Sequence, residues 1–331
     1  MIRPLSIIFI LSLFSFNAFS DVVLITYNMA QLKKKGIDFV PCTERRIKPQ
    51  INNLILDSNA HIYKEKYFAL ALQEVWTKKA FSALKEAVKN KSFNMFPLEF
   101  NDIKQNGVVT ITNLKVLEAS FTPYTKDSHA KKGMLYILGE TEDGEKIGIL
   151  NVHTGYSGNK KPSATHIRQF YEIGEFVLTK KKQSSSFIIA GDFNSGPDLK
   201  YDRQYYDVAE AVWDDGILPI MGSVSMSHVD VNGVTWDNTN NPLVNNPTFF
   251  LKLVNKIDHG STGWGQNDST LDHIFISEEL ESKQSSIVFN EPVPLHCPKR
   301  TSADGKSTLS DHYGVMAVLK SKPPRVSDIN P

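Results

Sequence analysis

The feature that most constrains the fold is an alternation of short strand-like segments with helical segments along the chain. Runs of β-branched and apolar residues predict strands at residues 22–27, 67–75, 107–112, 133–138, 146–152, 187–190, 271–276 and 313–319. Apolar residues at helical spacing predict helices after Thr43, after Thr77 and over residues 162–179. The turn at Asp143-Gly144 predicts a hairpin, so the sheets are expected to be mixed. We therefore predict an α/β sandwich of mixed β-sheets flanked by helices.

Two local features leave element boundaries open. Pro49 falls in the first helical segment, where it is tolerated only if it lies in the first turn, so the start of this helix is undecided. Residues 219–269 are rich in Asn and Gly and are expected to be irregular. A loop of that length in a compact domain is usually functional or misassigned.

The N-terminal residues have the pattern of an export signal. Arg3 precedes an apolar run at residues 5–14 that is too short to span a bilayer, and Ala18-Phe19-Ser20 offers a cleavage site. We predict a signal peptide over residues 1–20 and a secreted protein, periplasmic or extracellular. An uncleaved N-terminal anchor is the alternative. A single domain is expected over residues 21–320, followed by a flexible tail over 321–331.

The charge and the two cysteines add weaker constraints. A formal net charge of +1 gives no broad basic surface of the kind that strong nucleic-acid binders carry, although a nuclease needs only a local groove. Cys42 and Cys297 could form a disulfide in an oxidising compartment, or remain two unrelated buried thiols. If the loops that hold them rise from one edge of the sandwich, the disulfide would clamp that rim.

Polar side chains recur where the predicted strands begin or end: Asn28, Glu74, His153, Asp192, Asn194, Asp272, Asp311 and His312. Each one alone is more typical of a turn, a cap or a structural histidine. Together they are expected to meet at one edge of the sandwich, where sites are usually built. Their oxygen donors suit Mg²⁺, or else Mn²⁺ or Ca²⁺, better than zinc.

These residues stand in the motifs TYN, LQEV, NVH, GDFN, LDH and SDH, in that order. The series resembles the endonuclease/exonuclease/phosphatase superfamily, which includes DNase I-like nucleases, abasic-site endonucleases, inositol-phosphate phosphatases and neutral sphingomyelinases. The resemblance extends over nearly the whole mature chain. It implies a four-layer α/β sandwich and a phosphodiesterase that uses a divalent metal, usually Mg²⁺.

The resemblance and the chemistry of in-line attack on a phosphodiester suggest a role for each residue. Glu74, with Asn28 and Asp311, is expected to hold the metal. His312 is the expected general base and Asp272 its orienting partner. Asp192 is an alternative activator of the water, and the sequence leaves this choice open. Asn194 and His153 are expected to donate hydrogen bonds to the phosphate.

Further motifs resemble those of bacterial sphingomyelinases. Lys132, in Lys-Lys-Gly, is expected to meet the substrate phosphate, and Trp236 and Asp237, in Thr-Trp-Asp, to line the substrate pocket. A solvated hairpin charge is the alternative for Lys132, and core packing is the alternative for Trp236. The segment 296–309 is polar where those enzymes carry an aromatic hairpin. Peripheral membrane contact would therefore fall to other apolar residues: Phe249, Phe250 and Trp264.

The sequence favours a monomeric, secreted phospholipase C-type enzyme that acts on a sphingomyelin-like phospholipid. A secreted DNase I-like nuclease is the first alternative, although nucleic acid is the less favoured partner. The second alternative, from another class, is a non-catalytic binding protein or toxin subunit. A phosphomonoesterase that acts on inositol lipids is a further, weaker alternative.

Overall fold

The computed structural model describes residues 21–34, 37–100, 106–125, 131–155, 164–197, 212–244, 268–295, 297 and 305–322. The predicted signal peptide, residues 323–331 of the predicted tail, and Phe249, Phe250 and Trp264 lie outside this range. Within it, no helix is both long enough and apolar enough to cross a membrane.

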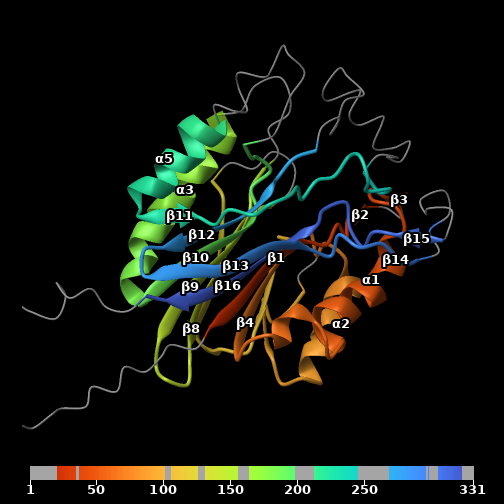
Figure 1. Ribbon diagram of the computed structural model, residues 1–331, viewed down its shortest axis with the longest axis horizontal. Helices are drawn as coiled ribbons and strands as arrows, with labels where there is room; N and C mark the ends of the chain where they lie inside the picture. The colour runs from red at the N-terminus through yellow and green to blue at the C-terminus, as the bar shows by residue number, and fades with distance from the viewer. Residues whose placement is uncertain are drawn as a thin grey trace, which may run out of the picture.

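Two six-stranded mixed sheets form the centre of the molecule (Figure 1). The order in the first sheet is β13 (Leu280–Val288), β16 (Gly314–Ser321), β1 (Val22–Asn28), β4 (Tyr67–Gln73), β6 (Val109–Thr112) and β5 (Asn94–Phe96). The order in the second is β11 (Met226–His228), β12 (Asp272–Ser277), β10 (Ser186–Asp192), β9 (Lys146–His153), β8 (Gly133–Glu140) and β7 (Lys115–Pro123). The predicted hairpin is the antiparallel pair β8–β9. Two small ribbons pair β2 (Lys33–Lys34) with β3 (Ile37–Asp38), and β14 (Val293–Pro294) with β15 (Lys306–Ser307).

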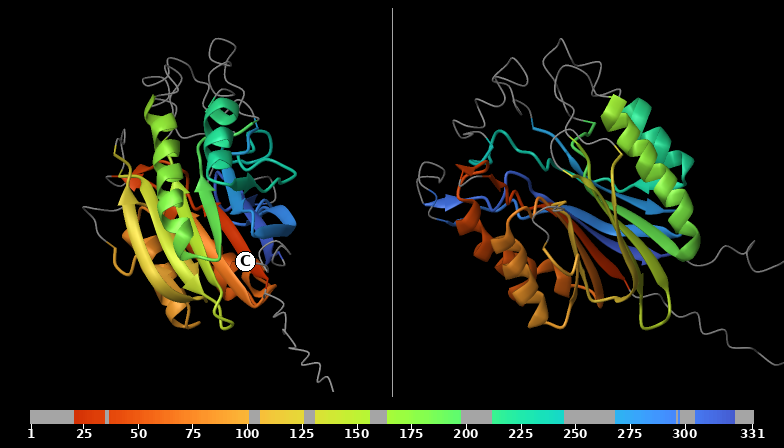
Figure 2. Two further views of the ribbon diagram at one scale, coloured as in Figure 1. Left: turned by 90° about the vertical axis from the view of Figure 1, so that its left-hand side faces the viewer. Right: turned by 180° about the vertical axis from the view of Figure 1, so that it is seen from behind.

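Helices cover the outer face of each sheet, which gives the predicted four-layer sandwich (Figure 2). The first sheet is covered by α1 (Thr43–Ile51), which continues into η1 (Asn52–Leu56), and by α2 (Lys78–Lys89). The second is covered by α3 (Ala164–Lys180), η4 (Val212–Ile217) and α5 (Leu218–Ser223). Short 3₁₀ turns, η2 (His61–Tyr63) and η3 (Lys181–Gln183), complete the helical elements of the described residues.

The two-residue period of the strands explains why the polar residues face inward. In β1, Val23 and Ile25 pack under the helices, whereas Val22 and Leu24 pack between the sheets. Asn28 continues the second row, so its side chain falls between the sheets at the end of the strand. The same alternation places three more polar residues between the sheets, at the ends of β9, β10 and β12: His153, Asp192 and Asp272.

Strand direction brings these ends together. The parallel pairs β1–β4 and β9–β10 finish at the same edge. The antiparallel strands β16 and β12 begin there. Across the ladders Asp192 therefore pairs with both His153 and Asp272. The Ser310-Asp311-His312 segment that precedes β16 lies beside the end of β1.

A buried polar layer joins the two sheets just below this edge. Gln73 of β4 donates from Nε2 to Oδ1 of Asn151 in β9 at 2.8 Å. Asn151 donates in turn to the carbonyl of Leu72 at 3.1 Å. Because a buried amide without partners is costly, these bonds fix how β4 faces β9, and hence how Glu74 faces His153.

The structure settles two features that the sequence leaves open. Pro49 is the seventh residue of α1 rather than part of its first turn, and the helix ends two residues later and widens into the π-helix η1. A proline inside a helix removes one backbone hydrogen bond, which is consistent with this early change of geometry. The segment 219–269 is not wholly irregular, because it contains most of α5 and all of β11, while residues 245–267 lie outside the described range.

Cys42 and Cys297 form a disulfide, which decides between the two alternatives that the sequence allows. Cys42 is the N-cap residue of α1, and Cys297 follows β14. The bond joins residues 255 positions apart and ties the start of α1 to the chain segment that leads toward Asp311.

Candidate active site

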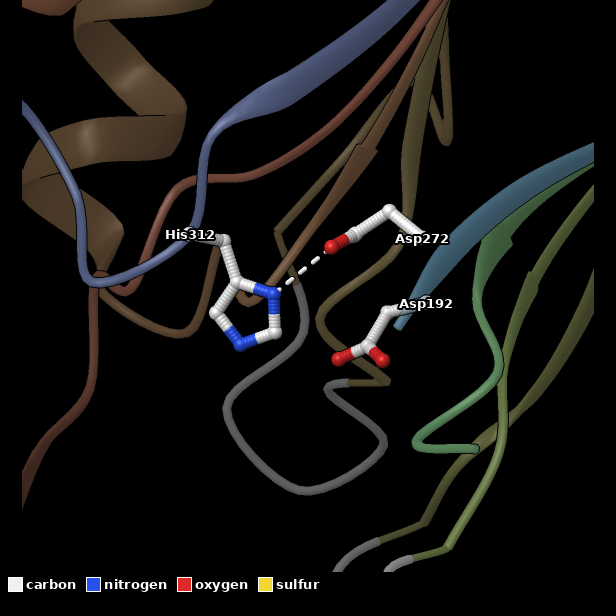
Figure 3. Close-up of side chains that lie close together, drawn as sticks. All are labelled: Asp192, Asp272 and His312. Carbon is white, nitrogen blue, oxygen red and sulfur yellow. Dashed lines mark hydrogen bonds and ion pairs between the residues drawn. The ribbon is translucent and has the colours of Figure 1, made fainter. Parts of the chain in front are cut away.

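A buried histidine–carboxylate pair lies at the polar edge. Nδ1 of His312 lies 2.8 Å from Oδ2 of Asp272, and the two side chains are 6% and 0% exposed. Figure 3 shows both Asp272 and Asp192 directed toward the imidazole. Burial favours neutral His312, but Asp272, with Asp192 and Asp311, outweighs it and raises the pKa of His312 to about 10.

Asp192 is the centre of the hydrogen bonds at this edge. Its Oδ2 accepts from Nδ2 of Asn28 at 2.9 Å, and its Oδ1 accepts from the backbone N–H of Asn194 at 2.8 Å. Asn194 has a φ of 47°, a left-handed conformation that Asn adopts more readily than most residues. The last residue of β10 therefore supplies the carboxylate, and the short turn that follows supplies one of its donors.

Glu74 and Asp311 form the more open side of the site. Glu74 directly follows β4 with a φ of 55°, and its side chain is 20% exposed. Burial and the neighbouring carboxylate of Asp311 raise the pKa of Glu74 to about 7. A bound cation would relieve the effect of this neighbouring carboxylate on Glu74.

His153 and Lys132 face each other on the side of the second sheet. Nζ of Lys132 lies 2.7 Å from Nε2 of His153 and donates to the carbonyl of Thr154 at 2.8 Å. Burial and the positive charge of Lys132 lower the pKa of His153 well below its usual value. His153 is therefore neutral, and its 3.4 Å approach to Oδ2 of Asp192 is not an ion pair.

The structure places the two predicted pocket residues differently. Trp236 lies edge-on to His312, with ring centroids 5.2 Å apart, and it is 8% exposed. Oδ1 of Asp237 accepts hydrogen bonds from the backbone N–H groups of Thr239 and Asn240 at 3.0 and 2.7 Å. Trp236 thus joins the cluster around His312, whereas Asp237 holds the turn that follows it.

Several side chains that support the site were not predicted. Oγ1 of Thr235 accepts from the backbone N–H groups of Leu271 and Asp272 at 2.9 and 3.2 Å, and its carbonyl accepts from Tyr313 at 2.7 Å. Thr235 thereby ties the chain around Asp272 to the chain after His312. The Thr-Trp-Asp motif marks this position in the sequence, but there it indicates a substrate contact for Trp236 and Asp237 rather than a role for Thr235.

Asn241 and Thr154 act through backbone carbonyls. Nδ2 of Asn241 donates to the carbonyls of Ser310 and Asp311 at 2.9 and 3.2 Å. The carbonyl of Thr154 accepts from Lys132 and from Nδ2 of Asn194 at 3.0 Å. A backbone acceptor leaves no mark in a sequence, so only the structure identifies it.

The donor set fits a divalent cation. Asp192, Asp272 and His312 each offer a ligand atom, and these atoms lie within 4.8 Å of one another. Among the described side chains, Oδ1 of Asp272 is buried without a hydrogen-bond partner, as expected for an atom that meets a cation or water. This group differs from the predicted ligands Glu74, Asn28 and Asp311, and the Asn28–Asp192 hydrogen bond joins the two.

A sequence model of the Endonuclease/Exonuclease/phosphatase family matches residues 25–312. The chain belongs to this family. The match covers every predicted site residue. Members of this superfamily hydrolyse phosphodiester bonds and typically depend on a divalent metal. No curated protein sequence matches the chain.

Solved structures share the DNase I-like fold. Sphingomyelinase C from Streptomyces griseocarneus matches with a TM-score of 0.61 at 15% identity, over 90% of this chain and 99% of that chain. Beta toxin from Staphylococcus aureus matches with a TM-score of 0.56 at 18% identity, over 91% and 99%. TDP2 from D. rerio, complexed with a single-strand DNA product, matches with a TM-score of 0.57 at 16% identity, over 91% and 99%. At these identities the likeness establishes the fold alone.

Proposed function

We propose that the chain is an exported, metal-dependent phosphodiesterase of the phospholipase C type that cleaves the headgroup from a sphingomyelin-like phospholipid. The observation that carries the proposal is the buried Asp272–His312 pair, 2.8 Å apart, at the edge where Glu74 and Asp192 converge. A histidine oriented by a carboxylate is a common device for moving the proton of an attacking water.

His312 removes a proton from the water that attacks phosphorus, and Asp272 keeps the imidazole oriented. This role requires neutral His312, whereas the surrounding carboxylates raise its pKa to about 10. His312 can give up its proton and act as the base only when the negative charge around it is reduced. If that change does not occur, His312 stays protonated and donates to the phosphate, and Asp192 takes the proton instead.

The opposite side of the site binds the phosphate. Lys132 brings a positive charge beside His153 and Asn194, whose side chains are held by the hydrogen bonds described above. Donors that are already fixed and partly desolvated stabilise developing negative charge better than mobile ones. Lys132 and Asn194 therefore hold the non-bridging oxygens as the negative charge on them grows. Neutral His153 accepts a hydrogen bond from Lys132 at Nε2 and so keeps the ammonium in place.

Glu74, Asn28 and Asp311 are the proposed metal ligands, and Asp192 and Asp272 lie within reach of the same space. A divalent cation held there, Mg²⁺ in our proposal, would neutralise the carboxylates, lower the pKa of His312 and take up charge on the phosphate. The carboxylates at this edge outnumber the positively charged side chains, and this excess of negative charge supports the proposal.

The choice of a lipid substrate rests on a sequence motif, the net charge and the fold. The Thr235-Trp236-Asp237 motif, a net charge of +1 and the shared fold with a sphingomyelinase C favour a phospholipid. The fold is also shared with TDP2 bound to a DNA product, which keeps a nuclease as the second candidate. The hypothesis of a non-catalytic binding protein is disfavoured because the predicted acidic and histidine residues meet at one edge.

Export is supported by the predicted signal peptide, and the disulfide is compatible with it. The proposed enzyme acts as a monomer in peripheral contact with a membrane.

A substrate panel tests the proposal. Purified protein with Mg²⁺ is offered sphingomyelin, phosphatidylcholine, plasmid DNA and a phosphoinositide, and the released products are measured. His312→Gln serves as the blank, and His61→Gln serves as the matched control, because His61 is a partly buried histidine that packs on Phe289 rather than in the cluster.

We expect the wild type and His61→Gln to release phosphocholine from sphingomyelin, and His312→Gln to release none. Cleavage of DNA without cleavage of lipid would contradict the proposed phospholipase activity and favour a nuclease. An absence of turnover on all four substrates with Mg²⁺, Mn²⁺ or Ca²⁺ would support a non-catalytic binding protein.

A further inference from the structure

Helix α1 buries two long polar side chains one turn apart. Arg46 and Gln50 are both 0% exposed, and Arg46 is the largest fully buried side chain of the described residues. Taking a guanidinium out of water costs several kcal/mol unless its donors are satisfied. A helix that only packed on the sheet would use apolar residues here, so the charge needs an explanation.

The partners of Arg46 are backbone carbonyls. Its Nε donates to Pro41 at 3.0 Å, its Nη1 to Met29 at 3.1 Å and to Leu309 at 2.8 Å, and its Nη2 to Ala30 at 2.6 Å. The planar guanidinium holds several donors in a rigid fork. No other side chain could span these carbonyls from one position.

Gln50 repeats two of these contacts. Its Nε2 donates to the carbonyls of Met29 and Leu309, both at 2.8 Å, and its Oε1 accepts from Gln31 at 2.6 Å. The carbonyls of Met29 and Leu309 therefore each receive two donors from α1. Doubled donation of this kind fixes both carbonyls in place more firmly than a single hydrogen bond.

The two shared carbonyls flank two proposed metal ligands. Met29 directly follows Asn28, and Leu309 precedes Asp311 by two residues. The hydroxyl of Ser310 also donates to the carbonyl of Asn28 at 2.7 Å, across 282 positions of sequence. The segments that carry Asn28 and Asp311 are thus held against each other from behind by α1.

We propose that Arg46, with Gln50, positions Asn28 and Asp311 relative to each other and thereby sets the affinity of the site for a divalent cation. The inference rests on the proposed metal-dependent function. Arg46 does not touch the cation space in this account. It acts through the backbone of the two ligand-bearing segments, in the way that groups behind a metal site orient its ligands.

Geometry and charge make opposite predictions for Arg46→Lys. A lysine keeps the buried positive charge but loses the planar fork, so it cannot reach the carbonyls of Pro41, Met29, Ala30 and Leu309 together. If only charge matters, this variant should bind Mg²⁺ as the wild type does. If the fork positions the ligands, its affinity should fall.

The test is calorimetric titration of Mg²⁺ into the metal-stripped full-length protein. We expect Arg46→Lys to weaken binding by about 10-fold or more, and Gln50→Leu by a smaller factor. Thr112→Val is the matched control, because it removes a buried hydroxyl that donates to the carbonyl of Phe68 at 2.6 Å, at the far end of β6. It should lower the melting temperature and leave Mg²⁺ affinity unchanged.

Activity gives a second readout. Raised Mg²⁺ should restore much of the maximal rate of both α1 variants, because the ligands remain present. Wild-type affinity in folded Arg46→Lys and Gln50→Leu would overturn the inference while leaving the proposed function intact. If Arg46→Lys does not fold, Gln50→Leu decides the matter by the same criterion. A wild-type protein that binds no divalent cation would overturn both proposals.

Discussion

At the scale of single residues, the proposed hydrolysis depends on His312 and Asp272 acting as a unit. Asp272 is fully buried, and its hydrogen bond fixes which nitrogen of His312 is turned toward the cluster. Residues that act as a unit are not additive when they are mutated. This property separates a working pair from two side chains that are merely neighbours.

We predict that His312→Gln lowers kcat/KM on the preferred phosphodiester by about 10²–10⁴-fold, the usual contribution of a positioned acid or base. Asp272→Asn should lower it by a comparable or smaller factor, and the double variant should be little worse than His312→Gln alone. Steady-state kinetics on the three variants measure this. If the double variant loses kcat/KM by the product of the two single factors, His312 and Asp272 act independently and the prediction is wrong.

The charge on His312 also predicts how stability varies with pH. In the unfolded chain the pKa of His312 is 6.5, and the carboxylates raise it to about 10 in the folded protein. A group with a raised pKa in the folded state stabilises the protein fully below its unfolded pKa, and that stability is lost as the pH rises through the folded pKa.

In EDTA, the melting temperature of the wild type should therefore fall between pH 7 and pH 10 more steeply than that of His312→Gln. Glu74, with a pKa of about 7, exerts most of its effect below this window. Thermal melts followed by circular dichroism between pH 7 and pH 10 provide the measurement. If the melting temperatures of the two proteins fall equally with pH, His312 is not held protonated.

At the scale of elements, the apolar strands inside the sheets were predictable, and the more polar strands at the outer side of each sheet were not. β1, β4, β9, β10 and β12 are buried along almost their whole length, and their composition identifies them. β7 and β13 lie at sheet edges with many exposed or half-buried positions. Charged and polar residues on such strands protect an edge from pairing with another chain, but they also hide the strand from a search for apolar runs.

The disulfide at the start of α1 belongs to this scale. It joins elements that are far apart in the sequence, so it removes much freedom from the unfolded chain. The double variant Cys42→Ala/Cys297→Ala should lose about 2–5 kcal/mol in the free energy of unfolding. Denaturant unfolding of the variant and the oxidised wild type measures the difference. If the two proteins unfold at the same denaturant midpoint and with the same dependence of the unfolding free energy on denaturant, the disulfide does not stabilise the fold.

At the scale of the whole molecule, the site follows from the direction of the strands. The sequence placed polar residues at strand ends, and the mixed sheets bring the ends of β1, β4, β9 and β10 to the starts of β12 and β16. The residues that hold this arrangement were beyond prediction. Arg46, Gln50 and Asn241 act on backbone carbonyls across long stretches of sequence, and no local pattern reports such contacts.

The central claim is that this edge hydrolyses a phosphodiester with a divalent cation held by its carboxylates. The most direct measurement is hydrolysis of bis(p-nitrophenyl) phosphate by the wild type and Glu74→Gln as Mg²⁺ is titrated from EDTA-treated protein. We predict no turnover without metal, saturable activation of the wild type, and a Glu74→Gln curve displaced to higher Mg²⁺ and partly restored there. Turnover in EDTA, or a Glu74→Gln curve that matches the wild type, would contradict the account.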